Sequence, residues 1–358
     1  MRRVKLVVSD FHIGTGRYRP DGTRNPIEDF YFGEKFIEFL EYHRTGEFHD
    51  AEVELIVNGD FFNLLQLSEV APEGDLFTER VCVELIQHVF EGHERVFDAL
   101  AHFNKDARRS ITFIMGNHDP GLVFDGVQRL LRERIGGRID FYVDHYDFDE
   151  VHIEHGNQFD ALNAFDTKKL FLTRGLPEPV VNLPWGSQYL IHVMTREKLR
   201  RPWIDKVTPH HRLLRWALFN DTRWFLGVAW RSFLFLLRSV FVPRKVGRFK
   251  LGTLLKAIWR YHPSPTLERE ARAQMEAKGY RTVIYGHTHI AMYREYDNGG
   301  VYVNCGSWNH VTSLDLGNLG RLVRLTYAFL EWNSDEGRWT PHLREWKGYH
   351  RVVEELYR

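Results

Sequence analysis

Short apolar segments rich in β-branched residues recur along the chain, and most of them end at a polar or glycine-containing sequence. They cover residues 4–9, 53–58, 111–115, 139–143, 151–154, 281–285, 301–304 and 322–332. Runs of this length and composition predict buried strands. Apolar residues recur with helical spacing at 27–42 and 77–103. Strands that alternate with helices predict an α/β fold.

The strand pattern stops between residues 161 and 276. This block contains six of the ten tryptophans, and its apolar residues follow helical spacing. We therefore expect a catalytic domain formed by residues 1–160 and 277–358. A mostly helical, aromatic-rich insertion, residues 161–276, would interrupt it. A chain of 358 residues is long enough for one large domain or two ordinary ones.

Charge is divided unevenly along the chain, although 48 Lys/Arg balance 48 Asp/Glu overall. Residues 166–260 carry 19 Lys/Arg and five Asp/Glu, a net charge of +14, so the remainder carries −14. A net charge of zero argues against a protein built around nucleic acid or an anionic membrane, but this division reopens the question for the insertion. With 43% hydrophobic and 27% charged residues, the chain is neither disordered nor fibrous.

Cysteine usage and the N-terminus both favour a cytoplasmic protein. Two distant cysteines, Cys82 and Cys305, cannot build a disulfide framework or a cysteine-based zinc site. The apolar residues 4–8 are too few for the hydrophobic region of a signal peptide. We therefore expect a reducing, cytoplasmic compartment.

Five short motifs stand at the ends of predicted strands. They are Asp10-Phe11-His12, Gly59-Asp60, Gly116-Asn117-His118-Asp119, His155-Gly156 and Gly286-His287-Thr288-His289. Open α/β sheets place their ligands at this edge. Carboxylate, imidazole and amide ligands suit Mn²⁺, Fe or Zn²⁺. Each motif alone is common in proteins, but the five together predict a metal centre.

This set resembles the calcineurin-like metallophosphoesterase superfamily, whose pattern is D-x-H, G-D, G-N-H-D/E, H and G-H-x-H. The resemblance covers residues 1–160 and about 280–330. Asn304-Cys305-Gly306-Ser307 is similar to the N-x-G-S ending of that superfamily. The resemblance implies a β-sandwich flanked by helices, and two divalent metal ions, with Mn²⁺ favoured over Fe or Zn²⁺.

The resemblance also implies a role for each motif residue. One metal would be bound by Asp10, His12 and His289. The other would be bound by Asn117, His155 and His287. Asp60 would bridge the two ions, and a bridging hydroxide would attack phosphorus. His118 would stabilise or protonate the leaving oxygen, and Asp119 would hold the imidazole of His118 in the useful tautomer.

A loop rich in arginine follows the first motif. Arg17, Arg19 and Arg24 could bind a substrate phosphate in bidentate fashion. An ordinary solvated loop explains the same residues equally well, and both interpretations stay open.

The centre of the insertion is a run of aromatic and aliphatic residues at 224–242. Arg223, Arg231 and Arg238 are spaced by eight and seven residues, so a helix would carry them as a narrow basic stripe. Arginines within such a run disfavour a spanning helix and favour one that lies in the membrane interface. Packing in the protein core is the alternative. Nucleic acid is disfavoured because its binding surfaces separate their aromatic residues.

An insertion of this character before the G-H-x-H motif is similar to that of the UDP-2,3-diacylglucosamine pyrophosphohydrolases of lipid A synthesis. That resemblance implies Mn²⁺-dependent release of UMP from a lipid-linked substrate by an enzyme peripheral to the inner face of the membrane. The third motif has His118 where that group usually has arginine. A soluble phosphodiesterase or nuclease of the same superfamily is the alternative, and a non-enzymatic scaffold is a third reading.

Overall fold

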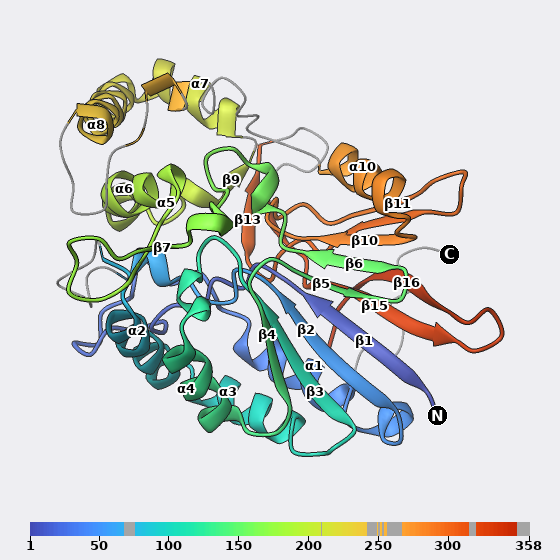
Figure 1. Cartoon of the computed structure of the whole chain (residues 1–358). Helices are drawn as coiled ribbons and strands as arrows, with labels where there is room; N and C mark the ends of the chain where they lie inside the picture. The colour runs from blue at the N-terminus through green and yellow to red at the C-terminus, as the bar shows by residue number, and fades with distance from the viewer. Residues whose placement is uncertain are drawn as a thin grey trace.

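Two β-sheets packed face to face form the centre of the molecule (Figure 1). The computed structural model describes residues 1–67, 76–208, 210–241, 249, 251–252, 254–255, 267–314 and 320–348. The larger sheet has the order β16-β15-β1-β2-β3-β4, and the smaller one has the order β11-β12-β10-β6-β5. Strands β1 to β4 pair in parallel, as do β6, β10 and β12.

The larger sheet comprises β1 (Arg3–Val8), β2 (Glu52–Asn58), β3 (Arg109–Ile114), β4 (Ile139–Tyr142), β15 (Thr326–Asn333) and β16 (Arg338–Glu345). The smaller sheet comprises β5 (His145–Phe148), β6 (Val151–Glu154), β10 (Thr282–Tyr285), β11 (Met292–Glu295) and β12 (Val301–Asn304). Each strand predicted from the sequence is found to within a few residues, except that the predicted strand at 322–332 is divided between β14 (Gly320–Val323) and β15.

Side chains of β1 alternate between two apolar cores. Val7 packs between the sheets with Ile56 and Ile284, while Leu6 and Val8 pack against the helices on the other face. This alternation is the two-residue period of a strand. Because both faces of the larger sheet are covered, its central strands are apolar almost throughout.

Helices cover the outer face of each sheet. The larger sheet is covered by α1 (Gly33–Tyr42), α2 (Glu79–Gly92), α3 (Glu94–Phe103) and α4 (Asp125–Ile135). The smaller sheet is covered by α10 (Glu268–Lys278), which packs on Tyr285 and Tyr302. The expected sandwich flanked by helices is therefore confirmed. The helical pattern at 77–103 proves to be two helices, because His93 has non-helical backbone angles (φ −135°, ψ 34°).

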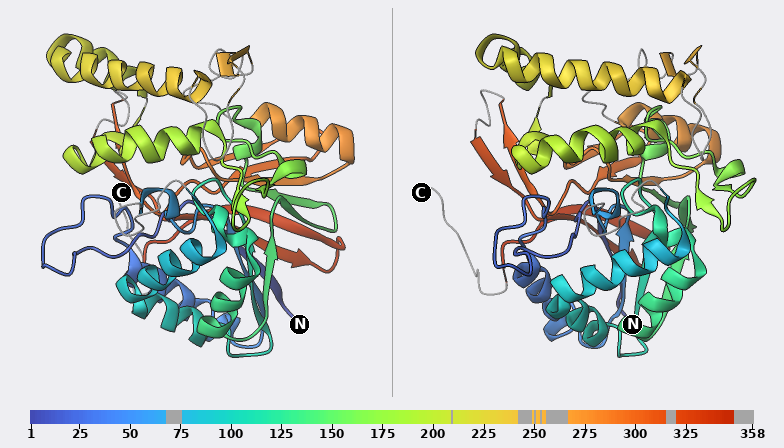
Figure 2. Two further views of the ribbon diagram at one scale, coloured as in Figure 1. Left: turned by 60° about the vertical axis from the view of Figure 1, so that its left-hand side comes forward. Right: turned by 90° about the vertical axis from the view of Figure 1, so that its left-hand side faces the viewer.

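The insertion stacks above one end of the sandwich as two helical layers (Figure 2). The inner layer is α5 (Trp185–Tyr189), a π-helical turn (Leu190–Met194) and α6 (Thr195–Arg200), and the outer layer is α7 (His210–Asn220) and α8 (Thr222–Phe241). The block also holds three strands of two residues each, which are too short for a periodic pattern to reveal. They are β7 (Phe171–Leu172), β8 (Val180–Val181) and β9 (Val207–Thr208), the last of which joins β13 (His310–Ser313) and β14 in a small sheet.

Candidate metal centre

The predicted metal ligands follow strands β1, β2, β3, β6 and β10, and most of them have an unusual backbone conformation. Six non-glycine residues in the described part of the chain have positive φ. Five of them are predicted ligands: Asp10, His12, Asp60, His287 and His289, with φ between 50° and 65°. This left-handed region costs an L-residue about 1–2 kcal/mol. Strain concentrated in this way is typical of functional sites.

One group of side chains gathers around Asp10. The Nε2 atom of His289 lies 3.1 Å from Oδ1 of Asp10 and 3.1 Å from Nε2 of His12. The ligand atoms of the three residues all lie within 4.8 Å of one another. These are the three residues predicted to hold the first metal.

A second group gathers around Asp60. Its Oδ2 atom lies 3.2 Å from Nε2 of His155 and 3.9 Å from Nε2 of His12. Asp60, His155 and His287 again offer ligand atoms within 4.8 Å of one another. Asp60 therefore lies between the two groups, where the resemblance placed a bridging carboxylate. The same 4.8 Å criterion also groups His118 with His12 and Asp60.

The donor atoms fit divalent cations. Oδ1 of Asn117 is buried and has no hydrogen-bond partner among the described residues, while Oδ1 of Asp10 and Nε2 of His155 face other candidate ligands. Buried polar atoms are costly without a partner, and a cation would supply one. The opposite atom of His155 is already anchored, because Nδ1 lies 2.8 Å from the carbonyl oxygen of Asn58. Such a contact fixes a ring for metal binding. We conclude that the chain carries a divalent metal site, and the assignment of each ligand stays a prediction.

Two glycines allow the strand ends to approach so closely. A Cβ atom on Gly59 would lie 2.4 Å from the His155 ring, and one on Gly116 would lie 2.2 Å from Oδ1 of Asp60. Any larger residue at either position would push a candidate ligand out of place.

The charged groups of the centre shift one another's pKa values. Burial lowers the pKa of His155, but the carboxylates of Asp60 and Asp10 outweigh it and raise the value to about 10. Burial raises the pKa of Asp60, but His155 and His118 hold it well below its usual value. The surroundings of Asp60 therefore favour the carboxylate form, which is the form that binds cations.

The imidazole of His118 is held by Asn63 rather than by the predicted Asp119. Nδ1 of His118 lies 3.0 Å from Oδ1 of Asn63. The oxygens of Asp119 instead accept the backbone N–H groups of Gly116 (2.6 Å) and Phe61 (2.8 Å). The predicted orienting role of Asp119 is therefore wrong, because backbone donors occupy its carboxylate. Burial and nearby Asp60 raise the pKa of Asp119 to about 7.

Two further residues at the centre escaped the sequence analysis. Oδ2 of Asp160 lies 3.5 Å from Nε2 of His287. Nδ2 of Asn309 donates to the backbone oxygens of Asp10 (3.1 Å) and Phe11 (2.9 Å). Asn63 carried one weak signal, because it and Gln66 are the two polar residues in the otherwise apolar stretch 61–67 after Asp60.

The arginine loop lies around Tyr31. The guanidinium groups of Arg17 and Arg24 are exposed and lie 5.6 and 5.5 Å from the centre of the Tyr31 ring. Arg19 is half-buried in the same loop. A role of the three arginines in phosphate binding stays a prediction.

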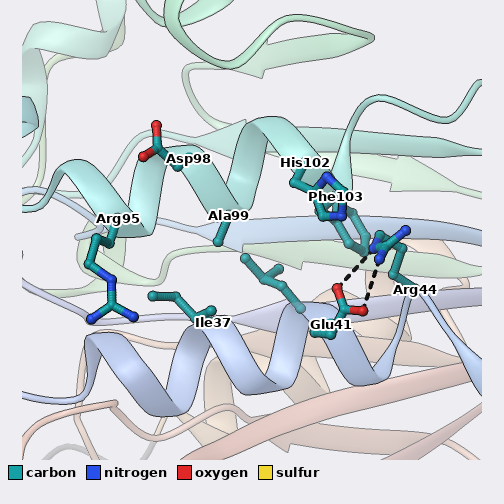
Figure 3. A pocket seen from close by; sticks show the side chains of 9 residues that line it. Ile37, Glu41, Arg44, Arg95, Asp98, Ala99, His102 and Phe103 are labelled. Atoms are coloured by element: carbon teal, nitrogen blue, oxygen red, sulfur yellow. Dashed lines mark hydrogen bonds and ion pairs between the residues drawn. The ribbon is translucent and has the colours of Figure 1, made fainter.

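A surface groove between α1 and α3 is separate from the metal centre (Figure 3). Its volume is about 340 Å³, and its lining includes Ile37, Ala99 and Phe103 together with the hydrogen-bonded pair Arg44 and Glu41. None of the predicted site residues lines this groove.

Helix α8 docks on the inner layer by its polar side chains. Ser239 Oγ accepts a hydrogen bond from Trp185 Nε1 (3.1 Å), and Arg231 pairs with the buried Glu197 of α6 (2.7 Å). Arg223 and Arg238 are exposed. Arg231 is half-buried and paired, which helical spacing alone does not reveal, because spacing does not show which side of a helix will dock.

The other side of α8 is apolar and exposed. Together with α7 it presents large side chains that are 37–78% exposed; we call this set the apolar face. It consists of Leu214, Trp216, Leu218, Phe219, Leu226, Trp230, Phe233, Leu234, Leu237 and Phe241. By length and composition alone, α8 could also cross a membrane, and no other helix in the described ranges qualifies.

Comparison with known proteins identifies the family. The family model of calcineurin-like phosphoesterases matches residues 5–291. A search of curated proteins found no match. Among solved structures, a dimetal phosphatase from Danio rerio is 10% identical, covers 96% of this chain and 99% of its own, and gives a TM-score of 0.37. The calcineurin-like phosphoesterase YfkN from Bacillus subtilis is 13% identical, with 96% and 90% coverage and a TM-score of 0.37.

A putative 5′-nucleotidase from Staphylococcus aureus is 11% identical, with 99% of this chain and 56% of that chain covered and a TM-score of 0.37. The assignment rests on the family match, which spans most of the chain and includes all five motifs. The reading as a non-enzymatic scaffold is thereby set aside. The chain belongs to the calcineurin-like phosphoesterase family, and it is a metal-dependent phosphoesterase.

Proposed function

We propose that this phosphoesterase hydrolyses a lipid-linked phosphoester or pyrophosphate, such as UDP-2,3-diacylglucosamine, at the inner face of a membrane. The observation that carries the proposal is the apolar face of α7 and α8. Exposed apolar patches of this extent mark interaction sites rather than ordinary surface.

A lipid surface suits the apolar face better than a purely apolar partner does. The segment 166–260 carries a net charge of +14, and Arg223 and Arg238 remain exposed on α8. Anionic headgroups attract such basic groups, while Trp and Phe side chains enter the acyl boundary. The contacts of Ser239 and Arg231 with the inner layer favour a helix that lies on the surface over one that spans it.

The insertion begins beside the metal centre, so that a bound lipid could present its phosphate there. Asp160, the last residue of the body before the insertion, contacts His287, and within the insertion the backbone N–H of Gly186 in α5 donates to the oxygen of Leu162 (2.8 Å). The inner helical layer lies between α8 and the sandwich (Figure 2).

The residues of the centre divide the chemistry between them. Asp10, His12 and His289 would hold one cation, Asn117, His155 and His287 the other, and Asp60 would contact both. Two such ions polarise phosphoryl oxygens and lower the pKa of water in the site. His118, anchored through Nδ1, keeps Nε2 for the leaving oxygen, where it can stabilise developing charge.

Release of UMP from UDP-2,3-diacylglucosamine in anionic vesicles, with Mn²⁺ present, tests the proposal. We expect turnover of this lipid to exceed that of the soluble diester bis(p-nitrophenyl) phosphate. Removal of metal with EDTA should abolish both reactions, and addition of Mn²⁺, Fe²⁺ or Zn²⁺ in turn should identify the metal that restores them.

Good turnover of the soluble diester without UMP release would overturn the lipid substrate. The alternative, a soluble phosphodiesterase or nuclease, predicts that the protein binds DNA or RNA with an affinity that falls steeply with salt. Absence of binding at low salt would remove the nuclease.

A further inference from the structure

A buried cluster of charges joins the insertion to the catalytic body. Lys198 of α6 is fully buried, and its Nζ contacts Oδ2 of Asp29 and Oδ2 of Asp205 (2.6 Å). Lys206 pairs with the second oxygen of Asp29 (2.7 Å). Two lysines therefore balance two aspartates, and the cluster is electrically neutral. Asp29 belongs to the body, whereas the other three residues belong to the insertion.

The same lysine reaches toward His118 through two amide side chains. Nζ of Lys198 donates to Oε1 of Gln66 (2.9 Å), and the same oxygen accepts from Nδ2 of Asn63 (2.7 Å). Oδ1 of Asn63 then faces Nδ1 of His118 (3.0 Å). Three hydrogen bonds thus connect an insertion helix to the imidazole.

Only one assignment of donors and acceptors fits these contacts. An ammonium group can only donate, so the atom of Gln66 that faces Lys198 must be oxygen. That oxygen can only accept, so Asn63 must present its NH₂ group to Gln66 and its carbonyl oxygen to His118. Nδ1 of His118 must therefore carry a proton. The contacts of Lys198 in this way select one tautomer of an imidazole that Lys198 reaches through two amide side chains.

We propose that Lys198 is a positioning residue for His118: by fixing Gln66 and Asn63, it pins the Nδ1–H of the imidazole and leaves Nε2 for the leaving oxygen of the substrate. The imidazole of His118 also packs edge-on against the ring of His12, with 4.4 Å between centroids. The backbone N–H of His118 donates to Oδ1 of Asp60 (2.7 Å). The inference rests on the proposed role of His118. The contacts that attach the insertion to the body then also fix the tautomer of His118.

Substitution of Gln66 by Met removes the oxygen that joins Lys198 to Asn63. It leaves Lys198 paired with Asp29, and it leaves Nδ2 of Asn63 with the long contact to Oδ2 of Asp29 (3.5 Å). We expect kcat for a diester with an alkyl leaving group to fall about tenfold or more, as for an impaired acid–base group. KM should change less than twofold. With a p-nitrophenolate leaving group, which needs little stabilisation, kcat should stay within about twofold of the wild type.

Glu197→Gln is the matched control. Glu197 is the neighbouring residue on α6, is equally buried, and contacts Arg231 and Trp224 instead of Gln66. This variant should loosen α8 without any change in leaving-group dependence on soluble diesters. Equal losses in the two variants, or a Gln66→Met enzyme that treats both leaving groups alike, would overturn the proposal.

Nuclear magnetic resonance of metal-free protein tests the tautomer without any activity. The ¹⁵N shifts of the His118 ring should show Nδ1 protonated in the wild type, and a shift toward the Nε2–H tautomer in Gln66→Met. An unchanged Nδ1–H form in the variant would overturn the positioning role. His118→Ala separates the two hypotheses. If this variant loses no more activity on the alkyl diester than on the p-nitrophenyl diester, the proposed function of His118 fails. If Gln66→Met still changes the tautomer of His118, the positioning role of Lys198 holds.

Discussion

The catalytic body and the insertion bury their charged residues for different ends. In the body, Asp10, Asp60 and His155 are buried, the first two have strained backbones, and all three belong to groups of side chains that could share a cation. In the insertion, Lys198 and Glu197 are buried in ion pairs with groups of opposite charge. Several carboxylates and imidazoles gathered around one volume mark the candidate reactive site, while ion pairs mark the places where the insertion is attached.

The body and the insertion also differ in where they place their large apolar residues. The body buries its large apolar residues in two cores on either side of one sheet, whereas α7 and α8 expose theirs. The insertion is also the most basic segment of the chain, so its apolar and its positively charged residues occur together. A region that is both apolar and basic at its surface fits the lipid contact proposed above.

The largest expected effect concerns the body. Asp60→Asn should lower kcat about a thousandfold or more, because the amide removes the negative charge between the two ligand groups. The free energy of unfolding measured without metal should fall, since the amide removes the charge that balances the buried imidazole of His155. Activity assays with saturating Mn²⁺, metal analysis and urea unfolding measure these quantities, with the exposed Asp335→Asn as control. Full activity in Asp60→Asn would contradict the catalytic account.

Replacement of a charge that attaches the insertion should act mainly on the free energy of unfolding. Lys198→Met leaves Asp29 and Asp205 with less compensation in a buried site, so we expect the free energy of unfolding to fall by about 3–5 kcal/mol. Burial lowers the pKa of Lys198, but the two aspartates outweigh it and raise the value, so the lysine is charged at neutral pH. Urea unfolding measures the loss. A loss under 1 kcal/mol would show that the cluster does not attach the insertion.

A third expected effect concerns a buried histidine of the body far from the metal ligands in sequence. Burial among aromatic rings lowers the pKa of His43 from 6.5 to about 4. The unfolded chain therefore takes up a proton near pH 6.5 that the folded protein refuses until about pH 4. Stability is fully present above pH 6.5 and is lost as the pH falls through this window, by about 2–3 kcal/mol between pH 7.5 and 4.5.

His43→Leu should remove this part of the acid sensitivity. The comparison is between urea unfolding of the variant and of the wild type at both pH values, because other groups titrate equally in the two proteins. Parallel pH profiles would refute the assignment to His43.

Short motifs at strand ends made the fold and most of the candidate site predictable. A ligand pair such as Asp10 and His12 needs only local geometry, so the sequence displays it directly. Asn63, Asp160 and Lys198 act through contacts with segments 55 to 169 residues away in the chain, which no local pattern encodes. The pairing of Arg231 with Glu197 was hidden for a related reason: spacing defines the faces of a helix, but tertiary packing decides which face is covered.

The smallest expected effect tests the apolar face itself. Leu226, Trp230 and Phe233 are spaced by four and three residues on one side of α8 and are 48–59% exposed. Replacement of all three by Gln removes large apolar groups that would enter the acyl boundary, each worth up to about 1.5–3 kcal/mol when fully buried. Since these groups are already half-buried, we expect binding to anionic vesicles to weaken about tenfold to a hundredfold.

Two comparisons make that result specific. Turnover of soluble bis(p-nitrophenyl) phosphate should be unchanged, because the three side chains point away from the docking contacts of Ser239 and Arg231. Gln substitutions at Ile290 and Tyr293, exposed apolar residues of the body at 39% each, serve as the matched control for vesicle binding and should leave it intact. If both sets weaken vesicle binding equally, membrane contact is not a property of the insertion. If neither does, the apolar face serves some other partner.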